Sequence, residues 1–315
     1  MDSISAQRKA LIIGCNGFVG RYLYAELESN GYDVWGADLK STDNRILALN
    51  LLNPDDVRNA LLQVQPDRIF HLAGQADVKK SWEQPQSTFE INVIGTLNLL
   101  EAVRKVGLAA RILLVGSSDQ YGTLGALGND ITESVPCHPR TPYAVSKMTQ
   151  EAIGVLYAKA YQMHICMTRS FNHAGAGQKE GFMIPDFATG IVKVERSEAN
   201  CVKVGNLDAK RDFTHVKDVV RAYRLISEMG GLGEIYNVGS GRTYSAREIL
   251  ERLCTMTQCQ IRIEQDPKKM RPSDTPVICC DYRKLTKDTG WKPEIGIDEI
   301  LEEVMNEKRM LLKNN

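Results

Sequence analysis

Near its amino end the chain reads Ala10-Leu11-Ile12-Ile13-Gly14-Cys15-Asn16-Gly17-Phe18-Val19-Gly20, an apolar run that ends in glycine and leads into a helical stretch. Three glycines here have the spacing G-x-x-G-x-x-G. The first permits a tight turn, and the second lets the backbone approach a pyrophosphate, which would lie at the helix N-terminus. We therefore expect a dinucleotide to bind at this loop, in contact with Gly14, Asn16, Gly17, Phe18, Val19 and Gly20.

Asp38 ends the next predicted strand, 18 residues after Gly20. Its carboxylate is placed to accept hydrogen bonds from ribose hydroxyls, and it would repel a 2′-phosphate. Lys40 follows closely and could accommodate that phosphate. The two residues favour different cofactors, so the sequence leaves NADH and NADPH open.

The order of the remaining elements indicates the fold class. Continuous apolar strands are predicted at 10–13, 33–37, 68–73, 111–116 and 164–168, with helices between them. Such a pattern implies a parallel sheet that is covered on both faces. The prediction is an α/β fold, a Rossmann-type doubly wound parallel sheet with a smaller, interleaved α/β lobe for the substrate. We assign residues 1–172 and about 213–240 to the dinucleotide-binding domain, and about 173–212 and 241–315 to the lobe.

Composition narrows the classes of protein that fit. Lys and Arg total 39, as do Asp and Glu, so the formal net charge of the 315 residues is zero and nucleic acid is a poor candidate partner. No apolar run approaches the ~18 residues of a membrane helix, and residues 1–9 do not resemble a signal peptide. The eight cysteines form no C-x-x-C pair. We expect reduced cysteines, no metal site and a cytoplasmic protein.

A candidate proton donor lies in Tyr143-Ala144-Val145-Ser146-Lys147, where the tyrosine and the lysine share one helix face. An ammonium ~4 Å from a phenol contributes about 4 kcal/mol at an effective dielectric constant of ~20. That corresponds to about three pKa units, so we expect Lys147 to lower the pKa of Tyr143 toward neutrality. Ser117 directly follows a predicted strand, which places its hydroxyl at the carboxyl edge of the sheet, beside the cofactor.

With the glycine loop, the serine and the Tyr/Lys pair in this order, the chain resembles an extended short-chain dehydrogenase/reductase over essentially its whole length. The resemblance includes His71-Leu72-Ala73-Gly74, Asn92 and Arg169-Ser170-Phe171-Asn172-His173. It implies that Tyr143 donates a proton, that Lys147 holds the nicotinamide ribose, and that Ser117 hydrogen-bonds the reacting oxygen. It adds Leu72, Ala73, Gly74 and Asn92 to the cofactor contacts.

A homodimer is also implied. The apolar residues between Phe89 and Val106 do not fit on one stripe of a helix, so this helix is buried inside the fold or packs against a second subunit. In the family, the equivalent helix and the Tyr/Lys helix form a four-helix dimer interface.

The second half of the chain resembles the branch of the family that acts on GDP-6-deoxyhexoses. Three segments carry this likeness: 171–179, 204–213 and 271–274. Arginines there would offer bidentate forks to a diphosphate. The substrate contacts that the sequence predicts are Ser118, Asp119, Asn172, Gln178, Lys179, Asn206, Arg211, Arg271 and Asp274.

Within that branch, the details favour a reductase that converts GDP-4-keto-6-deoxy-D-mannose to GDP-D-rhamnose with NADPH or NADH. A 4,6-dehydratase needs an acid/base beside the catalytic hydroxyl, usually Glu, whereas this chain has Asp119, whose reach is shorter by ~1.5 Å. A misplacement of ~1 Å can cost ~100-fold in rate. Three alternatives stay open: GDP-mannose 4,6-dehydratase, the 4-epimeric reductase that gives GDP-6-deoxy-D-talose, and a non-enzymatic dinucleotide sensor.

Overall fold

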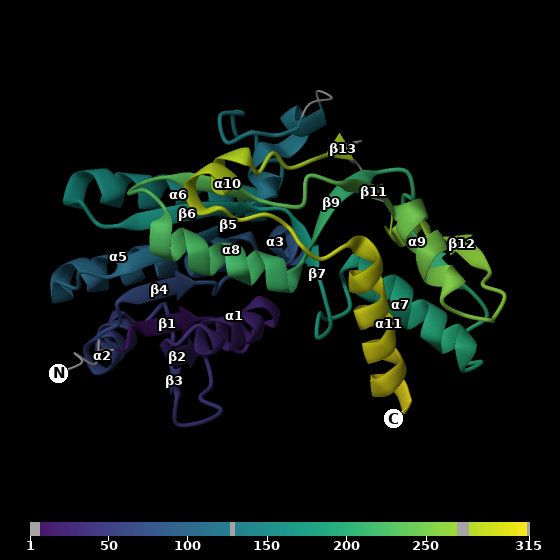
Figure 1. The fold of residues 1–315 in the computed structure, drawn as a ribbon, viewed down its shortest axis with the longest axis horizontal. Coiled ribbons are helices and arrows are strands. Elements are labelled where there is room, and N and C mark those ends of the chain that lie inside the picture. The colour runs from purple at the N-terminus through teal and green to yellow at the C-terminus, as the bar shows by residue number, and fades with distance from the viewer. Residues whose placement is uncertain (1–6, 127–129, 270–276, 314–315) are drawn as a thin grey trace.

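The computed structural model of the protein describes residues 7–126, 130–269 and 277–313 (Figure 1). In chain order the elements are β1 (Lys9–Ile13), α1 (Phe18–Ser29), β2 (Asp33–Asp38), β3 (Ile46–Ala48), α2 (Pro54–Val64), β4 (Arg68–His71), α3 (Val78–Glu83), α4 (Pro85–Phe89), a π-helical turn (Glu90–Ile94), α5 (Gly95–Val106), β5 (Arg111–Ser117), a 3₁₀ segment (Ser118–Ala126), α6 (Pro142–Tyr161), β6 (Ile165–Ser170), β7 (Asn172–Ala174), α7 (Met183–Glu195), β8 (Val202–Val204), β9 (Lys210–His215), α8 (Val216–Met229), β10 (Ile235–Val238), β11 (Thr243–Ser245), α9 (Ala246–Thr255), β12 (Ile263–Gln265), a 3₁₀ turn (Pro267–Lys269), β13 (Val277–Ile278), α10 (Arg283–Thr289) and α11 (Ile297–Lys313).

The main sheet has the predicted doubly wound arrangement. Among the described residues it contains seven parallel strands in the order β10-β6-β5-β4-β1-β2-β3. The chain leaves β1 in one direction along the sheet and returns through β4 in the other. The carboxyl ends of β1 and β4 therefore form the crevice where such sheets bind ligands.

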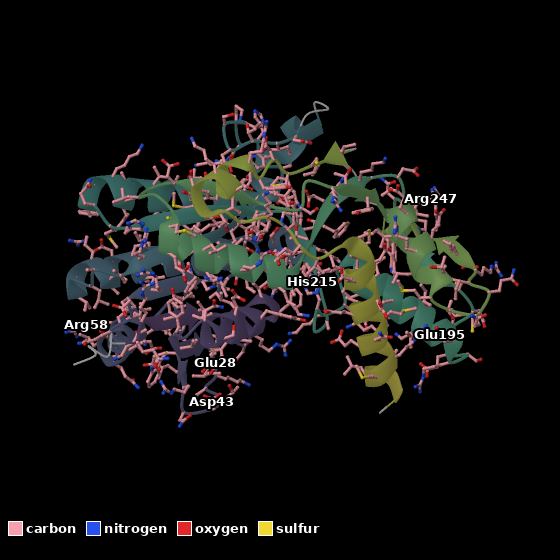
Figure 2. All side chains as sticks on the ribbon, viewed as in Figure 1. Glu28, Asp43, Arg58, Glu195, His215 and Arg247 are labelled. Carbon is pink, nitrogen blue, oxygen red and sulfur yellow. The ribbon has the colours of Figure 1, made fainter. Side chains whose placement is uncertain are left out.

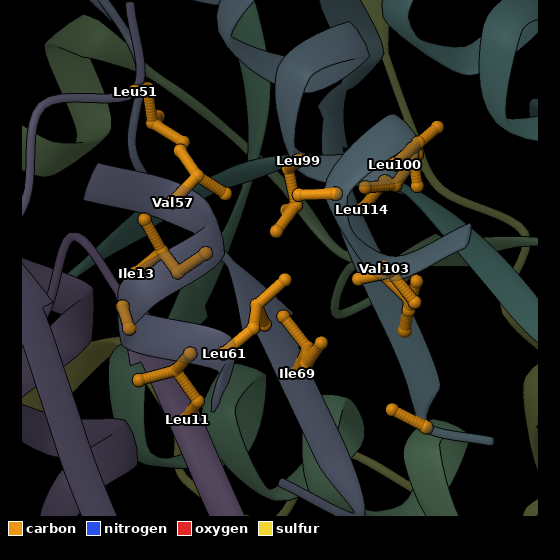
Figure 3. Packing of buried hydrophobic residues seen from close by; sticks show 14 of the residues in the cluster. Leu11, Ile13, Leu51, Val57, Leu61, Ile69, Leu99, Leu100, Val103 and Leu114 are labelled. Atoms are coloured by element: carbon orange, nitrogen blue, oxygen red, sulfur yellow. The ribbon is translucent and has the colours of Figure 1, made fainter. Parts of the chain in front are cut away.

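Two apolar layers hold the helices on the sheet. On one face, residues of α2 and α5 pack on residues of β1, β4 and β5, including Leu61, Leu99, Val103, Ile69 and Leu114 (Figure 3). On the other face, α1, α8 and α10 cover the same strands. Strands that are buried on both faces become continuous apolar runs, which is why they could be recognised in the sequence.

Local capping explains where two of these helices begin. The Asn53 side chain accepts a hydrogen bond from the Asp55 N–H, and Pro54 occupies the first turn of α2. Thr141 does the same for α6 by accepting from the Ala144 N–H at 3.0 Å. These caps set the first turn of α6, where Tyr143 lies.

The second lobe contains α7, α9 and α11, which pack together, and two small sheets. Two expectations about its boundaries need correction. Strand β9 pairs with β7, β11 and β13 in the lobe, so only α8 and β10 return to the main sheet. Residues 283–291 belong with the main domain, because Leu285 and Trp291 are buried in its core beside α8.

His215 joins the two parts of the molecule. Figure 2 shows it between the side that carries Asp43 and the lobe that carries Glu195. His215 is buried at the start of α8, its Nδ1 accepts from the Lys217 N–H, and its Nε2 lies 2.9 Å from Glu303 of α11. None of the helices formed by the described residues is long and apolar enough to span a membrane.

Candidate active site

The glycine loop lies against the end of β4, as its predicted role requires. Gly14 has a φ of +92°, and a Cβ there would lie only 2.7 Å from the Ala73 nitrogen. The N–H groups of Leu72 and Ala73 donate to the Ile13 carbonyl at 2.9 and 2.8 Å. A Cβ at Gly20 would lie 2.3 Å from the Gly14 oxygen, so α1 also packs tightly on the loop. This cradle, which any side chain would fill, fits a dinucleotide pyrophosphate at the N-terminus of α1.

Asp38 orients the loop through its carboxylate. One oxygen accepts from the Asn16 N–H at 3.0 Å, and the other accepts from the Leu39 N–H at 2.8 Å. The Asn16 amide in turn donates to the Lys40 carbonyl at 3.1 Å. Each carboxylate oxygen can accept a further hydrogen bond, so Asp38 remains able to bind ribose. The structure therefore places Asn16, Asp38 and Lys40 together, as expected.

Three predicted cofactor residues from distant parts of the chain meet beside β4. A Cβ at Gly74 would lie 2.9 Å from Asn92 Oδ1 and 3.4 Å from Lys147 Nζ. Asn92 is buried on the π-helical turn, where its amide accepts from the Gln75 N–H at 2.8 Å and donates to Ser146 Oγ at 2.9 Å. The turn thus aims the Asn92 amide at the helix that carries Lys147.

Tyr143 and Ser117 lie together at the carboxyl edge of the sheet. Tyr143 is buried in the first turns of α6, and burial raises the pKa of its phenol above the ordinary value. The charge of Asp119 raises that pKa further, whereas a hydrogen bond with Ser117 lowers it. The expectation that Lys147 brings this pKa toward neutrality is wrong, because burial outweighs the other effects and holds the phenol in its protonated form.

Lys147 is held by a different set of partners. Its Nζ donates to the Val115 carbonyl at 2.8 Å and to Gln150 Oε1 at 3.0 Å. Burial lowers the pKa of Lys147 to about 8. The ammonium is therefore charged at neutral pH and fixed to the end of β5, within the region that Gly74 and Asn92 border.

The loop after β5 carries the other predicted contacts. Ser117 Oγ accepts from the Asp119 N–H at 3.2 Å, and the Ser117 N–H donates to Gln120 Oε1 at 3.0 Å. Ser118 is buried beside it, and Asp119 is half-buried. Because the charge of Asp119 acts on Tyr143, the structure brings this carboxylate close to the phenol.

The segment after β7 crosses from the main domain to the lobe and is tied to α1. Tyr22 donates to the Ala176 carbonyl at 2.8 Å, and Arg21 donates to the Gly177 carbonyl at 3.3 Å. The rings of Phe18 and His173 stack with centroids 6.3 Å apart, so the predicted cofactor residue Phe18 contacts the predicted substrate loop.

The predicted substrate residues are less completely assembled. Asn172 and Lys179 are exposed, whereas Gln178 is buried and donates to the His173 carbonyl at 3.2 Å. Burial of Gln178 makes its side chain part of the loop's own packing. Asn206 and Arg211 are half-buried in the lobe. Arg271 and Asp274 lie outside the described residues.

Comparison with known proteins identifies the family. The model of the family described as GDP-mannose 4,6 dehydratase matches residues 11–304. The chain belongs to this family. It is a branch of the extended short-chain dehydrogenases/reductases, as the motifs predicted, and membership alone does not distinguish a dehydratase from a reductase.

Individual relatives in the GDP-mannose 4,6-dehydratase family include both activities. GDP-6-deoxy-D-mannose reductase from Pseudomonas aeruginosa is 35% identical over 301 residues, which cover 95% of this chain and 97% of the reductase. GDP-mannose 4,6-dehydratase from Vibrio cholerae is 27% identical over 351 residues, which cover 96% and 94% of the two chains.

Solved structures agree with these relatives. The structure of RMD from P. aeruginosa complexed with NADPH has a TM-score of 0.87 and 34% identity, and the match covers 97% of this chain and 100% of that one. UDP-glucose 4-epimerase from Thermus thermophilus in complex with NAD has a TM-score of 0.85 and 28% identity over 96% of this chain and 99% of the epimerase. These findings confirm the predicted class of NAD(P)-dependent enzyme that acts on nucleotide sugars.

Some residues that shape this family member's site carried no recognisable motif. Gln150 accepts from Lys147, Ser146 receives the Asn92 amide, and Gln120 receives the Ser117 N–H. Gln150 lies one helical turn after Lys147, which is the signal that could have found it. Gln120 gave no such signal, because its partners come from β5 and α6. Among the residues that the structure describes, no group of three His, Cys, Asp or Glu side chains is placed to hold a metal.

Proposed function

We propose that the protein reduces the C4 keto group of GDP-4-keto-6-deoxy-D-mannose to give GDP-D-rhamnose, with NADPH or NADH as the cofactor. The observation that carries this proposal is the buried Tyr143 phenol, which contacts Ser117 and stays protonated at neutral pH. Reduction of a ketone needs a proton donor in that state. The 35% identity to GDP-6-deoxy-D-mannose reductase supports the choice of substrate.

The protein's own groups account for the proton chemistry. The bound nicotinamide supplies the hydride that the carbonyl carbon receives. Tyr143 donates its phenolic proton to the carbonyl oxygen, while the Ser117 hydroxyl hydrogen-bonds that oxygen and stabilises its developing charge. The Lys147 ammonium, which is charged below a pKa of about 8, stabilises the tyrosinate that remains. A solvent proton then restores the phenol.

The cofactor residues fit either nicotinamide dinucleotide. The backbone cradle at Gly14 and Gly20 suits the pyrophosphate, and Gly74 leaves room beside Asn92 and Lys147 for a ribose. The relative RMD is complexed with NADPH, which favours that cofactor here, and Lys40 adds a positive charge beside the adenosine side of the loop.

A dehydratase is the second candidate, because the matching family model and the V. cholerae relative carry that name. That reaction needs a base that reaches C5 and an acid for the C6 hydroxyl. Asp119 is the carboxylate nearest to the phenol's field, and its side chain is one methylene shorter than Glu. We therefore favour the reductase. A talose-forming reductase uses the same groups on the other face of the sugar, whereas a non-enzymatic sensor would have no use for a proton donor.

The protein works as a homodimer in this proposal, through the outer faces of α5 and α6. Apolar side chains there are open to solvent: Leu156 is 60% exposed, Tyr161 50% and Ile94 46%. Arg104 lies over the Tyr161 ring at 5.0 Å, which joins the two helices into one surface. The prediction is checked by light scattering, where Leu156→Glu should convert a dimer to a monomer; an unchanged mass would contradict the interface. All eight cysteines are unpaired, which suits the cytoplasmic location that we propose.

Two parallel incubations test the reaction. Purified protein is mixed with GDP-4-keto-6-deoxy-D-mannose and either NADPH or NADH, and separately with GDP-mannose without added cofactor. The proposal expects loss of absorbance at 340 nm in the first mixture only. A keto sugar formed from GDP-mannose, without net oxidation of cofactor, would instead establish the dehydratase.

A further inference from the structure

A buried polar network joins the end of β5 to helix α6. The fully buried Gln120 has two partners for its amide. Oε1 accepts from the Ser117 N–H at 3.0 Å, and Nε2 donates to Glu151 Oε2 at 2.9 Å. Glu151 lies on α6, four residues after Lys147 and eight after Tyr143. The helix that carries the proton donor is therefore connected to the serine loop through one side-chain amide.

Arg169 of β6 fixes the carboxylate in this network. Its Nε and Nη2 bind the two oxygens of Glu151 at 2.8 and 2.7 Å, and both side chains are buried. The guanidinium also lies 4.8 Å from the centre of the Tyr121 ring. A bidentate pair leaves the carboxylate little freedom to turn. The direction from which Gln120 approaches Glu151 is thereby fixed as well.

Gly116 leaves the space that Gln120 needs. A Cβ at this position would lie 2.7 Å from Gln120 Oε1 and 2.3 Å from the Thr168 carbonyl oxygen. Glycine inside a strand often marks such a close approach. The residue before Ser117 thus lets a side chain, rather than a neighbouring strand, receive the last N–H of β5.

We propose that Gln120 is a positioning residue that holds Ser117 at a fixed separation from Tyr143. Its amide links the serine backbone to Glu151, and Arg169 prevents that acid from moving. A second tie, from Lys147 to the Val115 carbonyl, holds the same strand end to α6. The inference rests on the proposed function, because it gives Ser117 and Tyr143 their roles in the reaction.

A double-mutant cycle tests the proposal. Gln120→Met keeps the length of the side chain and removes both hydrogen bonds. Misplacing the serine by a fraction of an ångström to ~1 Å should lower kcat roughly 10- to 100-fold, with the Kd for NADPH unchanged. In the Ser117→Ala background the same change should alter kcat by less than about 2-fold, since no hydroxyl remains to be positioned. Equal losses in both backgrounds, or no loss in either, would overturn the proposal.

A matched control separates positioning from general destabilisation. Thr289→Val removes a buried hydroxyl on α10 that donates to the Leu285 carbonyl and accepts from the Trp291 N–H. We expect it to lower Tm as Gln120→Met does, yet to leave kcat unchanged. A comparable fall of kcat in this control would assign the effect of Gln120 to stability and overturn the proposal.

Hydrogen exchange at the Ser117 amide gives a readout that does not need activity. The proposal expects slow exchange in the unsubstituted protein and faster exchange in Gln120→Met, with Thr289→Val unchanged. Fast exchange in the unsubstituted protein would refute the hydrogen bond even if the variant failed to fold. If the unsubstituted protein shows no reductase activity, the proposed function fails, and the exchange rates alone decide the role of Gln120.

Discussion

Raising the pH from 7 to 9 should switch off the reductase by removing the charge of Lys147. Burial lowers the pKa of this ammonium to about 8. The charged fraction falls from about nine tenths at pH 7 to about one tenth at pH 9, so kcat should fall roughly tenfold if only the charged form supports proton donation. Tyr143 does not supply this transition, because burial raises the pKa of its phenol.

Single-turnover oxidation of NADPH, followed at 340 nm with saturating keto sugar, measures this dependence directly. Saturation removes the effect of pH on substrate binding, and rapid mixing limits exposure of the sugar to alkali. Lys147→Met should be slow at pH 7 and nearly flat between pH 7 and 9. A rate for the unsubstituted enzyme that is flat over this interval, or that falls only above pH 10, would refute the role of the buried ammonium.

Three further outcomes follow from the same geometry. Tyr143→Phe should lower kcat by ~10²- to 10⁴-fold and leave the NADPH Kd, measured by fluorescence titration, within about 2-fold; an unchanged kcat would exclude the phenol as proton donor. Gly14→Ala should abolish NADPH binding and lower Tm, because a Cβ would lie 2.7 Å from the Ala73 nitrogen at a φ of +92°; normal binding would exclude the cradle. Burial lowers the pKa of His71 to about 3, below its unfolded value of ~6.5, so its contribution to stability is lost as the pH falls, by about 2 kcal/mol between pH 7 and 5. Urea unfolding of His71→Leu should lack that loss relative to the unsubstituted protein, and equal pH slopes for the two would contradict it.

The main domain could be predicted from the sequence because its signals are local. Apolar strands that are buried on both faces, a glycine loop and Pro142 before a helix each carry information within a few residues. Strand β9 was placed in the wrong sheet for the opposite reason. Its residues read as an ordinary strand, and its partners β7, β11 and β13 are distant segments that no local pattern specifies.

The site followed the same division. Motifs correctly placed Gly14 beside Ala73 and Asn92 near Lys147. The pKa of Tyr143 was predicted in the wrong direction because the spacing of two residues on a helix gives no measure of burial. In the folded protein the loss of solvent around the phenol outweighs the charges near it. The lysine's hydrogen bonds to β5 likewise depend on tertiary packing.

Transfer of deuterium from the cofactor tests the proposed reaction most directly. The enzyme is incubated with GDP-4-keto-6-deoxy-D-mannose and NADPH that carries deuterium at C4 of the reduced nicotinamide, on each face in turn, and the sugar is examined by NMR. The account predicts that one of the two labelled cofactors places deuterium at C4 of a 6-deoxyhexose, in the rhamnose configuration. A sugar without label at C4, or label only at C6, would contradict direct reduction of the C4 carbonyl.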